Sequence, residues 1–233
     1  MVSSASAPLV SVIVPAYNAQ DSLGATLESL LAQDYAPFEI VVVDDGSTDA
    51  TRAVAATFPT IRCLEQPNQG PAVARNTGMA AARGEFFAFV DADDLVPGTK
   101  LRVQAGFLVE HPSVGCVLGR QEIVLDGVEA PSWMTHDAIY GDLDGIPLIS
   151  AMVRRSVIDE IGGFDPAFVP SEDRDLIVRM KERGIEVSVL PDLVLYRRFH
   201  GSNLSFHRPA KHPLLRSLKA KIDRGREGQE EER

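Results

Sequence analysis

The sequence predicts an α/β fold with a doubly wound, mainly parallel sheet flanked by helices. Within the first 95 residues, four short runs rich in β-branched or aromatic residues alternate with segments of helical periodicity. The first of these runs is apolar almost throughout, which is typical of a strand buried on both faces of a parallel sheet. Each run ends in polar residues, and doubly wound sheets bind ligands at the carboxyl ends of their strands.

The elements of the first half follow from this alternation. The predicted strands are Val10–Val14, Ile40–Val43, the stretch IRCLEQ and Phe86–Val90, and the predicted helices are Gln20–Gln33, one from about Thr48, and Pro71–Arg83. In the first helix four leucines fall at i, i+4, i+7 and i+8 and predict one buried stripe, namely Leu23, Leu27, Leu30 and Leu31. Pro71 suits a first helical position and Gly84 a helix C-terminus, which bounds the third helix.

The second half is less regular, and its elements are predicted from local signals. They are a helix over Thr99–Glu110, two strands around an Asp126–Gly127 turn, a strand and short helix ended by Gly162–Gly163, a helix capped by Ser171, and two short strands before a polar loop. Leu176, Ile177 and Met180 are expected to form the buried face of the helix after Ser171. This half is expected to be a smaller, mixed one.

We expect one domain over residues 1–206, with a regular first half over 1–95 and a more variable second half over 96–206. Residues 207–233 form a basic and acidic tail that is expected to be partly helical and frayed at its end. The tail's amphipathic stretch HPLLRSLKAKIDR fits a membrane surface, packing on the body, or a second subunit, and the sequence leaves these open.

Composition narrows the class of protein and its surroundings. The 233 residues are 45% hydrophobic, which is ordinary for a globular protein with a core. A net charge of −10 argues against nucleic acid or an anionic membrane as the main partner. Cys63 and Cys116 suggest neither a disulfide framework nor a zinc site. With no signal sequence and no apolar run long enough to span a membrane, we expect a cytoplasmic protein, with peripheral contact at the inner membrane face left open for the tail.

Three groups of acids stand at predicted strand or helix ends. Asp44–Asp45 follows the second strand, where acids either shape a turn or accept hydrogen bonds from a ligand such as a nucleobase. Asp91-Ala92-Asp93 follows the fourth strand, and residues two apart in extended chain share a face. That spacing suits Mg²⁺, which takes one or two carboxylates plus water and phosphate oxygens, although turn acids are the structural alternative. Asp94 is expected to serve only the turn.

Glu172–Asp173 begins the helix after Ser171, where acids gain about 0.3–1 kcal/mol from the helix dipole. This structural reading competes with a catalytic one. A carboxylate there can act as a general base if its geometry relative to the proton is fixed.

Taken together, these segments resemble the family-2 glycosyltransferases of the GT-A fold, a Rossmann-like α/β fold. The resemblance covers about Val10–Ser205 and rests on six motifs in the expected order, namely VSVIVPAYNA, VVVDDGSTDAT, NQGPAVARNTGMAAARGEFFAFVDADD, RRSVIDEIGGFDPAF, SEDRDLIVRM and YRRFHGSNLS. Each motif alone is weak or moderate, and the order makes the set specific. The resemblance implies an enzyme that moves a sugar, hexosyltransferase-type, from a nucleotide diphosphate sugar to an acceptor hydroxyl, with inversion.

The resemblance also implies roles for individual residues. Nucleotide-binding residues would be Pro15, Ala16, Tyr17, Asp45, Arg75 and Asp91. Asp93, the last acid of the DXD motif, would bind Mn²⁺ or Mg²⁺, with His200 as a second metal ligand. Asp173 would be the catalytic base. Arg75 and the adjacent Asn76 fit ordinary helix positions equally well, and a lone histidine such as His200 also fits a structural role.

Partners follow from the same resemblance, which implies that residues 1–95 are the nucleotide-binding half and residues 96–206 the acceptor-binding half. The donor would be a nucleotide diphosphate sugar, with a UDP-sugar favoured, and the acceptor a glycan, a lipid-linked sugar or another hydroxyl compound. Glu172 and Trp133 are the candidate acceptor or sugar contacts. An aromatic ring such as that of Trp133 stacks on a sugar face, although a tryptophan packed in the core fits the sequence as well. Neither a nucleic-acid partner nor a transmembrane segment is expected, and a homodimer is left open.

Three other functions compete with this one. A sugar-phosphate nucleotidyltransferase also uses a doubly wound sheet and acidic metal ligands, but VPAYNAQDSLG lacks the basic residues of its phosphate loop. A receiver domain would explain Asp44–Asp45 and leave the later acids without a use. A degenerate domain that only binds nucleotide is disfavoured because every expected acidic position is occupied.

Overall fold

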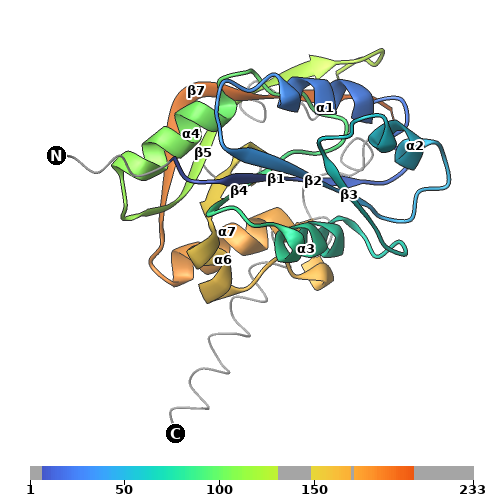
Figure 1. Cartoon of the computed structure of the whole chain (residues 1–233). Coiled ribbons are helices and arrows are strands. Elements are labelled where there is room, and N and C mark those ends of the chain that lie inside the picture. Colours follow the sequence, from blue (N-terminus) through green and yellow to red (C-terminus); the bar gives the residue numbers. More distant parts are fainter. Residues whose placement is uncertain (1–6, 131–147, 169–170, 202–233) are drawn as a thin grey trace, which may run out of the picture.

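In the computed structural model, residues 7–130, 148–168 and 171–201 are described (Figure 1). Their strands form a seven-stranded sheet in the order β3-β2-β1-β4-β6-β5-β7. The strands are β1 (Val10–Ala16), β2 (Phe38–Asp44), β3 (Arg62–Glu65), β4 (Phe86–Phe89), β5 (Val114–Leu125), β6 (Met152–Arg154) and β7 (Glu186–Phe199). One sheet thus takes strands from both halves of the chain.

Pairing in this sheet is mainly parallel, which confirms the predicted fold class. β1 pairs in parallel with both β2 and β4, and β2 pairs in parallel with β3. β6 is the exception, since it runs antiparallel to its neighbours β4 and β5. The carboxyl ends of β1, β2 and β4 therefore meet at one edge, where the acidic segments predicted to form a site begin.

Helices cover both faces of the sheet (Figure 1). They are α1 (Leu23–Leu31), α2 (Thr51–Ala56), α3 (Pro71–Ala81), α4 (Lys100–Glu110), α6 (Arg155–Ile161) and α7 (Glu172–Glu182), with short 3-10 turns η2 (Leu148–Ser150) and η3 (Pro166–Phe168). Val12 and Val14 pack with α1 and α4 on one face, whereas Ile13 packs with α3, α6 and α7 on the other. Burial on both faces explains why the strand runs are apolar without alternation.

The leucine stripe of α1 is largely as predicted. Leu23, Leu27 and Leu30 are fully buried, but the side chain of Leu31 is 41% exposed, so its inclusion in the stripe was wrong. Leu31 is the last residue of the helix and lies beyond the part of α1 that the sheet covers. The helices are also shorter than predicted at their ends, and α3 stops at Ala81 rather than Arg83.

The predicted hairpin around Asp126–Gly127 does not form within the described residues. β5 ends at Leu125, residues 128–130 are not a strand, and β5 pairs in parallel with β7 instead. The two short strands predicted near the end of the chain are one strand, β7, with an irregularity where Gly119 and Arg120 face Leu190 and Leu193. The extra residues opposite that point include Pro191, which has no backbone N–H to donate to the ladder.

Two expectations fall on residues that are not described. Trp133 and the tail over residues 207–233 both lie outside the described ranges. Among the helices that are described, none combines the length and apolar character needed to cross a bilayer.

Candidate active site

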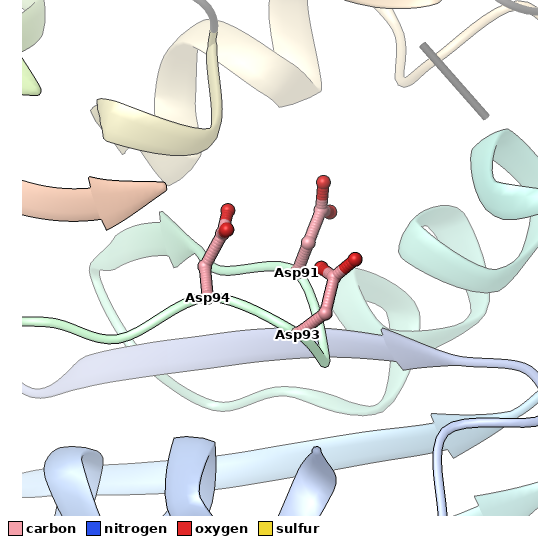
Figure 2. A group of neighbouring side chains, drawn as sticks. All are labelled: Asp91, Asp93 and Asp94. Atoms are coloured by element: carbon pink, nitrogen blue, oxygen red, sulfur yellow. The ribbon is translucent and has the colours of Figure 1, made fainter. Parts of the chain in front are cut away.

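The fourth strand leads into a tight turn that gathers three carboxylates. β4 ends at Phe89, and the backbone N–H of Asp94 donates to the carbonyl of Asp91 at 3.1 Å. The hydroxyl of Thr26 on α1 donates to the Ala92 carbonyl at 2.9 Å and holds the turn against this helix. One oxygen from each of Asp91, Asp93 and Asp94 lies within 4.8 Å of the others. Figure 2 shows the three carboxyl groups on the same side of the turn.

This geometry corrects the predicted reason for the grouping. The carboxylates meet because the chain turns at Ala92 and Asp93, not because the chain continues in extended form. The turn also brings in Asp94, which was expected to serve the turn alone. Asp94 is 2% exposed, and its carboxylate accepts a hydrogen bond of 2.9 Å from the Arg198 backbone of β7.

Burial and mutual repulsion make two of these acids, Asp93 and Asp94, harder to ionise than ordinary aspartates. Burial, followed by the charge of Asp91, raises the pKa of Asp93. Burial and then the charges of Asp91 and Asp93 raise the pKa of Asp94 well above its usual value. Carboxylates crowded in this way are relieved by a cation, and hard oxygen donors suit Mg²⁺ or Mn²⁺. The residues present therefore fit a divalent ion.

His200, the second predicted metal ligand, lies beside this turn. Its Nε2 is 3.0 Å from Oδ2 of Asp93, and both side chains are about one quarter exposed. His200 directly follows β7, and a backbone bridge between Leu95 and Tyr196 ties that strand to the chain after the turn. The pairing brings a nitrogen donor to the acid predicted to bind metal.

Arg75 is placed differently from the prediction. It was expected to contact nucleotide, but its side chain is 5% exposed and faces carboxylates. Its guanidinium nitrogens lie 2.7 Å from Asp91, 3.0 Å from Glu172 and 3.8 Å from Asp173. Burial alone would lower the pKa of Arg75, and these three charges more than offset that and raise it. The guanidinium thus joins the turn after β4 to the first turn of α7.

The neighbouring Asn76 does not face a nucleotide site either. Its side-chain amide donates to the Phe164 carbonyl at 2.7 Å, and its oxygen accepts from the Phe164 N–H at 2.8 Å. The Phe164 ring in turn lies 5.3 Å from the Arg75 guanidinium. Asn76 therefore fixes the loop that carries the ring packed on Arg75.

The first turn of α7 carries the predicted base. The side chain of Asp173 is 25% exposed, and burial raises its pKa to about 6, against the opposing charge of Arg75. Glu172 was expected to contact the acceptor, but it is 6% exposed and directed to Arg75. Ser171 occupies the N-cap position without capping through its side chain, which donates to the Phe168 carbonyl instead.

The predicted nucleotide side lies at the carboxyl ends of β1 and β2. Tyr17 is 51% exposed there, whereas Ala16 is buried in the sheet, so only its backbone can line a pocket. Asp45 is 3% exposed and holds the loop before α3, accepting hydrogen bonds from Gln66, Gln69 and Gly70 at 2.7, 2.9 and 2.8 Å. Its Oδ2 takes only one of these bonds and keeps a lone pair for a further donor.

One buried residue near the site was missed by the sequence reasoning. Lys100, the first residue of α4, is fully buried and donates to the Ser150 carbonyl at 3.2 Å. Burial lowers its pKa to about 7, and the charge of Asp94 opposes this shift. Nothing in the residue pattern points to this burial, because a lysine at a helix start is normally exposed.

Comparison with known proteins agrees with this fold. The model of glycosyl transferase family 2 matches residues 11–162, which is more than half of the chain. The chain therefore belongs to glycosyl transferase family 2, as the motifs predicted. The fold and the acidic turn define a GT-A member of this group.

Two curated relatives show how the chain compares at the sequence level. It is 37% identical over 142 residues to the putative teichuronic acid biosynthesis glycosyltransferase TuaG of Bacillus subtilis, covering 56% of each chain. It is 32% identical over 173 residues to the UDP-Glc:alpha-D-GlcNAc-diphosphoundecaprenol beta-1,3-glucosyltransferase WfgD of Escherichia coli, covering 71% of this chain. The chain spans 56% and 66% of these two relatives.

Solved structures give the same fold. S. aureus TarS in complex with UDP-GlcNAc matches with a TM-score of 0.73 at 26% identity, over 86% of this chain and 61% of that one. The mannosyltransferase PcManGT of Pyrobaculum calidifontis, in complex with GDP-Man and Mn²⁺, matches with a TM-score of 0.63 at 26% identity, over 86% of this chain and 59% of that one.

Proposed function

We propose that this chain transfers a sugar from a nucleoside diphosphate sugar to an acceptor hydroxyl by a single displacement that inverts the anomeric centre. The observation that carries the proposal is the arrangement around Arg75, which holds the acidic turn and the candidate base Asp173 in one site. Family membership supports the reaction class, and the separate parts of the site support the mechanism.

Asp173 acts as the general base in this proposal. It takes the proton of the acceptor hydroxyl while the oxygen attacks the anomeric carbon and the bond to the diphosphate oxygen breaks. A carboxylate with a pKa near 6 is a stronger base than an ordinary aspartate and is still mostly ionised at neutral pH. Because attack and departure occur on opposite faces in one step, the configuration inverts.

Asp93 and His200 are the proposed metal ligands, with Asp91 and Asp94 beside them. A bound Mn²⁺ or Mg²⁺ supplies a Lewis acid that stabilises the negative charge of the leaving diphosphate. Asp91 is held by Arg75 at the edge of this cluster, in a position suited to the ribose or a metal-bound water. The carboxylates keep the ligand atoms close together before any ion binds.

We further propose a UDP-sugar as donor. The support is that TarS was solved with UDP-GlcNAc and that WfgD is named for UDP-Glc. Tyr17 and Asp45 are the proposed nucleotide contacts, because Tyr17 is exposed and Asp45 retains a free lone pair. The acceptor is a hydroxyl of a glycan or a lipid-linked sugar, the second of these being what WfgD's name describes for that protein.

A ligand panel tests the donor and the metal together. Thermal unfolding of the chain is measured with UDP, GDP and their sugars, each with and without Mn²⁺ or Mg²⁺. A ligand that binds only the native state at 100 times its Kd stabilises by about 2.7 kcal/mol. We expect a shift that needs both a uridine nucleotide and the metal, and release of UDP when an acceptor is added. Release of pyrophosphate would indicate a nucleotidyltransferase, and no shift with any ligand would reject the proposal.

A further inference from the structure

Arg75 connects parts of the chain that are far apart in the sequence. It lies on α3, 16 residues before Asp91 and 97 residues before Glu172. Each partner is bound through a different nitrogen, Nη2 for Asp91 and Nη1 for Glu172. A planar guanidinium fixes the directions of both bonds, which the point charge of a lysine does not do.

The surroundings of Arg75 leave it little freedom to move. The residue is 4% exposed, and the Phe164 ring packs 5.3 Å from its guanidinium. Phe164 is itself held edge-on against Phe89 of β4 and clamped through its backbone by Asn76. These contacts hold the guanidinium in one position, and among the described residues it is almost completely buried.

Asp173 has Arg75 as its ion-pair partner among the described residues. Its Oδ1 is buried and has no hydrogen-bond partner among the residues that the structure describes, and the nearest ion pair is Arg75 at 3.8 Å. Oδ2 is thus the oxygen of this carboxylate that an acceptor hydroxyl can reach. The Oε2 atom of Glu172 is buried without a hydrogen bond in the same part of the structure.

We propose that Arg75 is a positioning residue that sets the carboxylate of Asp173 relative to Asp91, and hence the base relative to the metal and diphosphate site. This role rests on the proposed function, because it needs Asp173 as the base. Arg75 touches neither donor nor acceptor in this account. It acts by keeping the first turn of α7 and the turn after β4 in one fixed relation.

The test compares two substitutions at Arg75. Arg75→Met removes the charge and keeps much of the volume, and Arg75→Lys keeps the charge but loses the planar fork. A misplacement of about 1 Å costs on the order of 100-fold in rate. We expect Arg75→Met to lower kcat by about that factor, while the donor KM and the Kd of UDP with Mn²⁺ change by less than about threefold. Arg75→Lys should recover only part of kcat.

Arg155→Met is the matched control. Arg155 also lies over a phenylalanine, 4.5 Å from the Phe87 ring, but it donates to the carbonyls of Ala82 and Gly84 at the opposite ends of the strands. Loss of its packing should lower the midpoint of thermal unfolding and leave kcat of the folded enzyme within about twofold.

A double variant separates positioning from simple charge balance. Arg75→Met leaves buried carboxylates unpaired, which destabilises the fold, and adding Glu172→Gln removes one of these charges. We expect Arg75→Met/Glu172→Gln to regain thermal stability without regaining kcat. Recovery of both would show that Arg75 only neutralises charge, and would overturn the proposal. A large rise in donor KM and in the Kd of UDP would overturn it in favour of direct nucleotide contact.

Failure of the proposed function gives a different result. If the wild-type chain transfers no sugar from any nucleotide sugar, the reaction class itself is wrong. If the wild type is active and Asp173→Asn keeps its rate, Asp173 is not the base, and the positioning role falls with it. If Asp173→Asn is inactive and Arg75→Met keeps full kcat, only the role of Arg75 is rejected.

Discussion

The imidazole of His200 lies 3.0 Å from the carboxylate of Asp93, although 107 residues separate them in the chain. Strand β7 brings the two side chains together, because a backbone bridge between Leu95 and Tyr196 ties this strand to the chain just after the acidic turn. An acid with a raised pKa and a histidine are thereby combined at the edge of the sheet where the proposed diphosphate site lies.

Asp93→Asn should weaken binding of Mn²⁺ in the presence of UDP by more than about tenfold, because it removes a charged oxygen ligand. His200→Gln should have a smaller effect in the same direction. Isothermal titration calorimetry measures both. Asp34→Asn is the control, since Asp34 is an exposed acid paired with Arg102. Unchanged Mn²⁺ binding by Asp93→Asn would remove the metal site from this turn.

Asp173→Asn should lower kcat on the order of 10²- to 10⁴-fold, the range that general acid–base groups contribute. Binding of UDP with Mn²⁺ should stay within about threefold, because the amide keeps the shape of the side chain. Steady-state release of UDP and calorimetry give the two quantities. Asp159→Asn on α6, an exposed position, is the control. Near wild-type turnover would show that another group takes the proton.

The pH dependence of kcat should report the same carboxylate. Because burial raises the pKa of Asp173 to about 6, half of the enzyme has lost the basic form at about that pH. The rate should fall as the pH drops through this value and level off above about pH 7. In Asp173→Asn the residual rate should no longer fall as the pH drops through this value. If the fall of kcat at low pH persists unchanged in the variant, a group other than Asp173 causes it.

Lys100 predicts a change in stability. Its pKa is about 7 in the fold, below the ordinary lysine value of 10.5, so the unfolded chain binds more protons between these pH values. The free energy of unfolding then rises with pH over this window, and the cost of the buried amine is largest at and below about pH 7. Lys100→Met should stabilise the chain near pH 7 by about 1–3 kcal/mol.

Urea unfolding at about pH 7 and about pH 9.5 measures this effect, and the gain of Lys100→Met should shrink at the higher pH. Arg102→Met, two residues away on the same helix and 55% exposed in its side chain, should show no such dependence on pH. A Lys100→Met variant that loses stability at both pH values would show that the bond to Ser150 outweighs the burial cost.

Two helical glycines predict opposite effects of the same substitution. A Cβ at Gly78 on α3 would lie 2.6 Å from the Ile13 side chain of β1, whereas one at Gly106 on α4 meets no atom within 4 Å. Gly106→Ala should stabilise by about 0.5–1 kcal/mol through helix propensity. Gly78→Ala should destabilise by about 1–3 kcal/mol because the helix must move off the sheet. Thermal unfolding of both variants checks this, and equal gains would mean that α3 packs less closely.

Much of the sheet could be predicted because its information is local. Val12 and Val14 lie on one face of the sheet and Ile13 on the other, and all three are buried, so every position of this run is apolar. The hairpin at Asp126–Gly127 failed for the opposite reason. The turn signal is local and Gly127 does adopt a positive φ of 69°, but β5 pairs with a strand more than 60 residues away.

The candidate site also contains residues that could be predicted from the sequence and contacts that could not. Asp91, Asp93 and Asp173 are recognisable from residue type and motif order, whereas the partners of Arg75 are not. Its contact with Glu172 spans 97 residues, and no periodicity in the sequence points from one to the other. Lys100 was missed because burial of a charged amine follows from how α4 packs, which is a property of the whole fold.

The contact between Asp94 and the backbone of Arg198 joins positions 104 residues apart. In a chain synthesised from its N-terminus, the acidic turn is therefore made long before the strand that completes it. Until β7 has been synthesised and added to the sheet, His200 is absent and the buried carboxylate of Asp94 lacks that backbone donor. Assembly of the proposed catalytic edge is thus a late event in folding, and a nascent chain that has the parallel half alone lacks one of the two proposed metal ligands, His200.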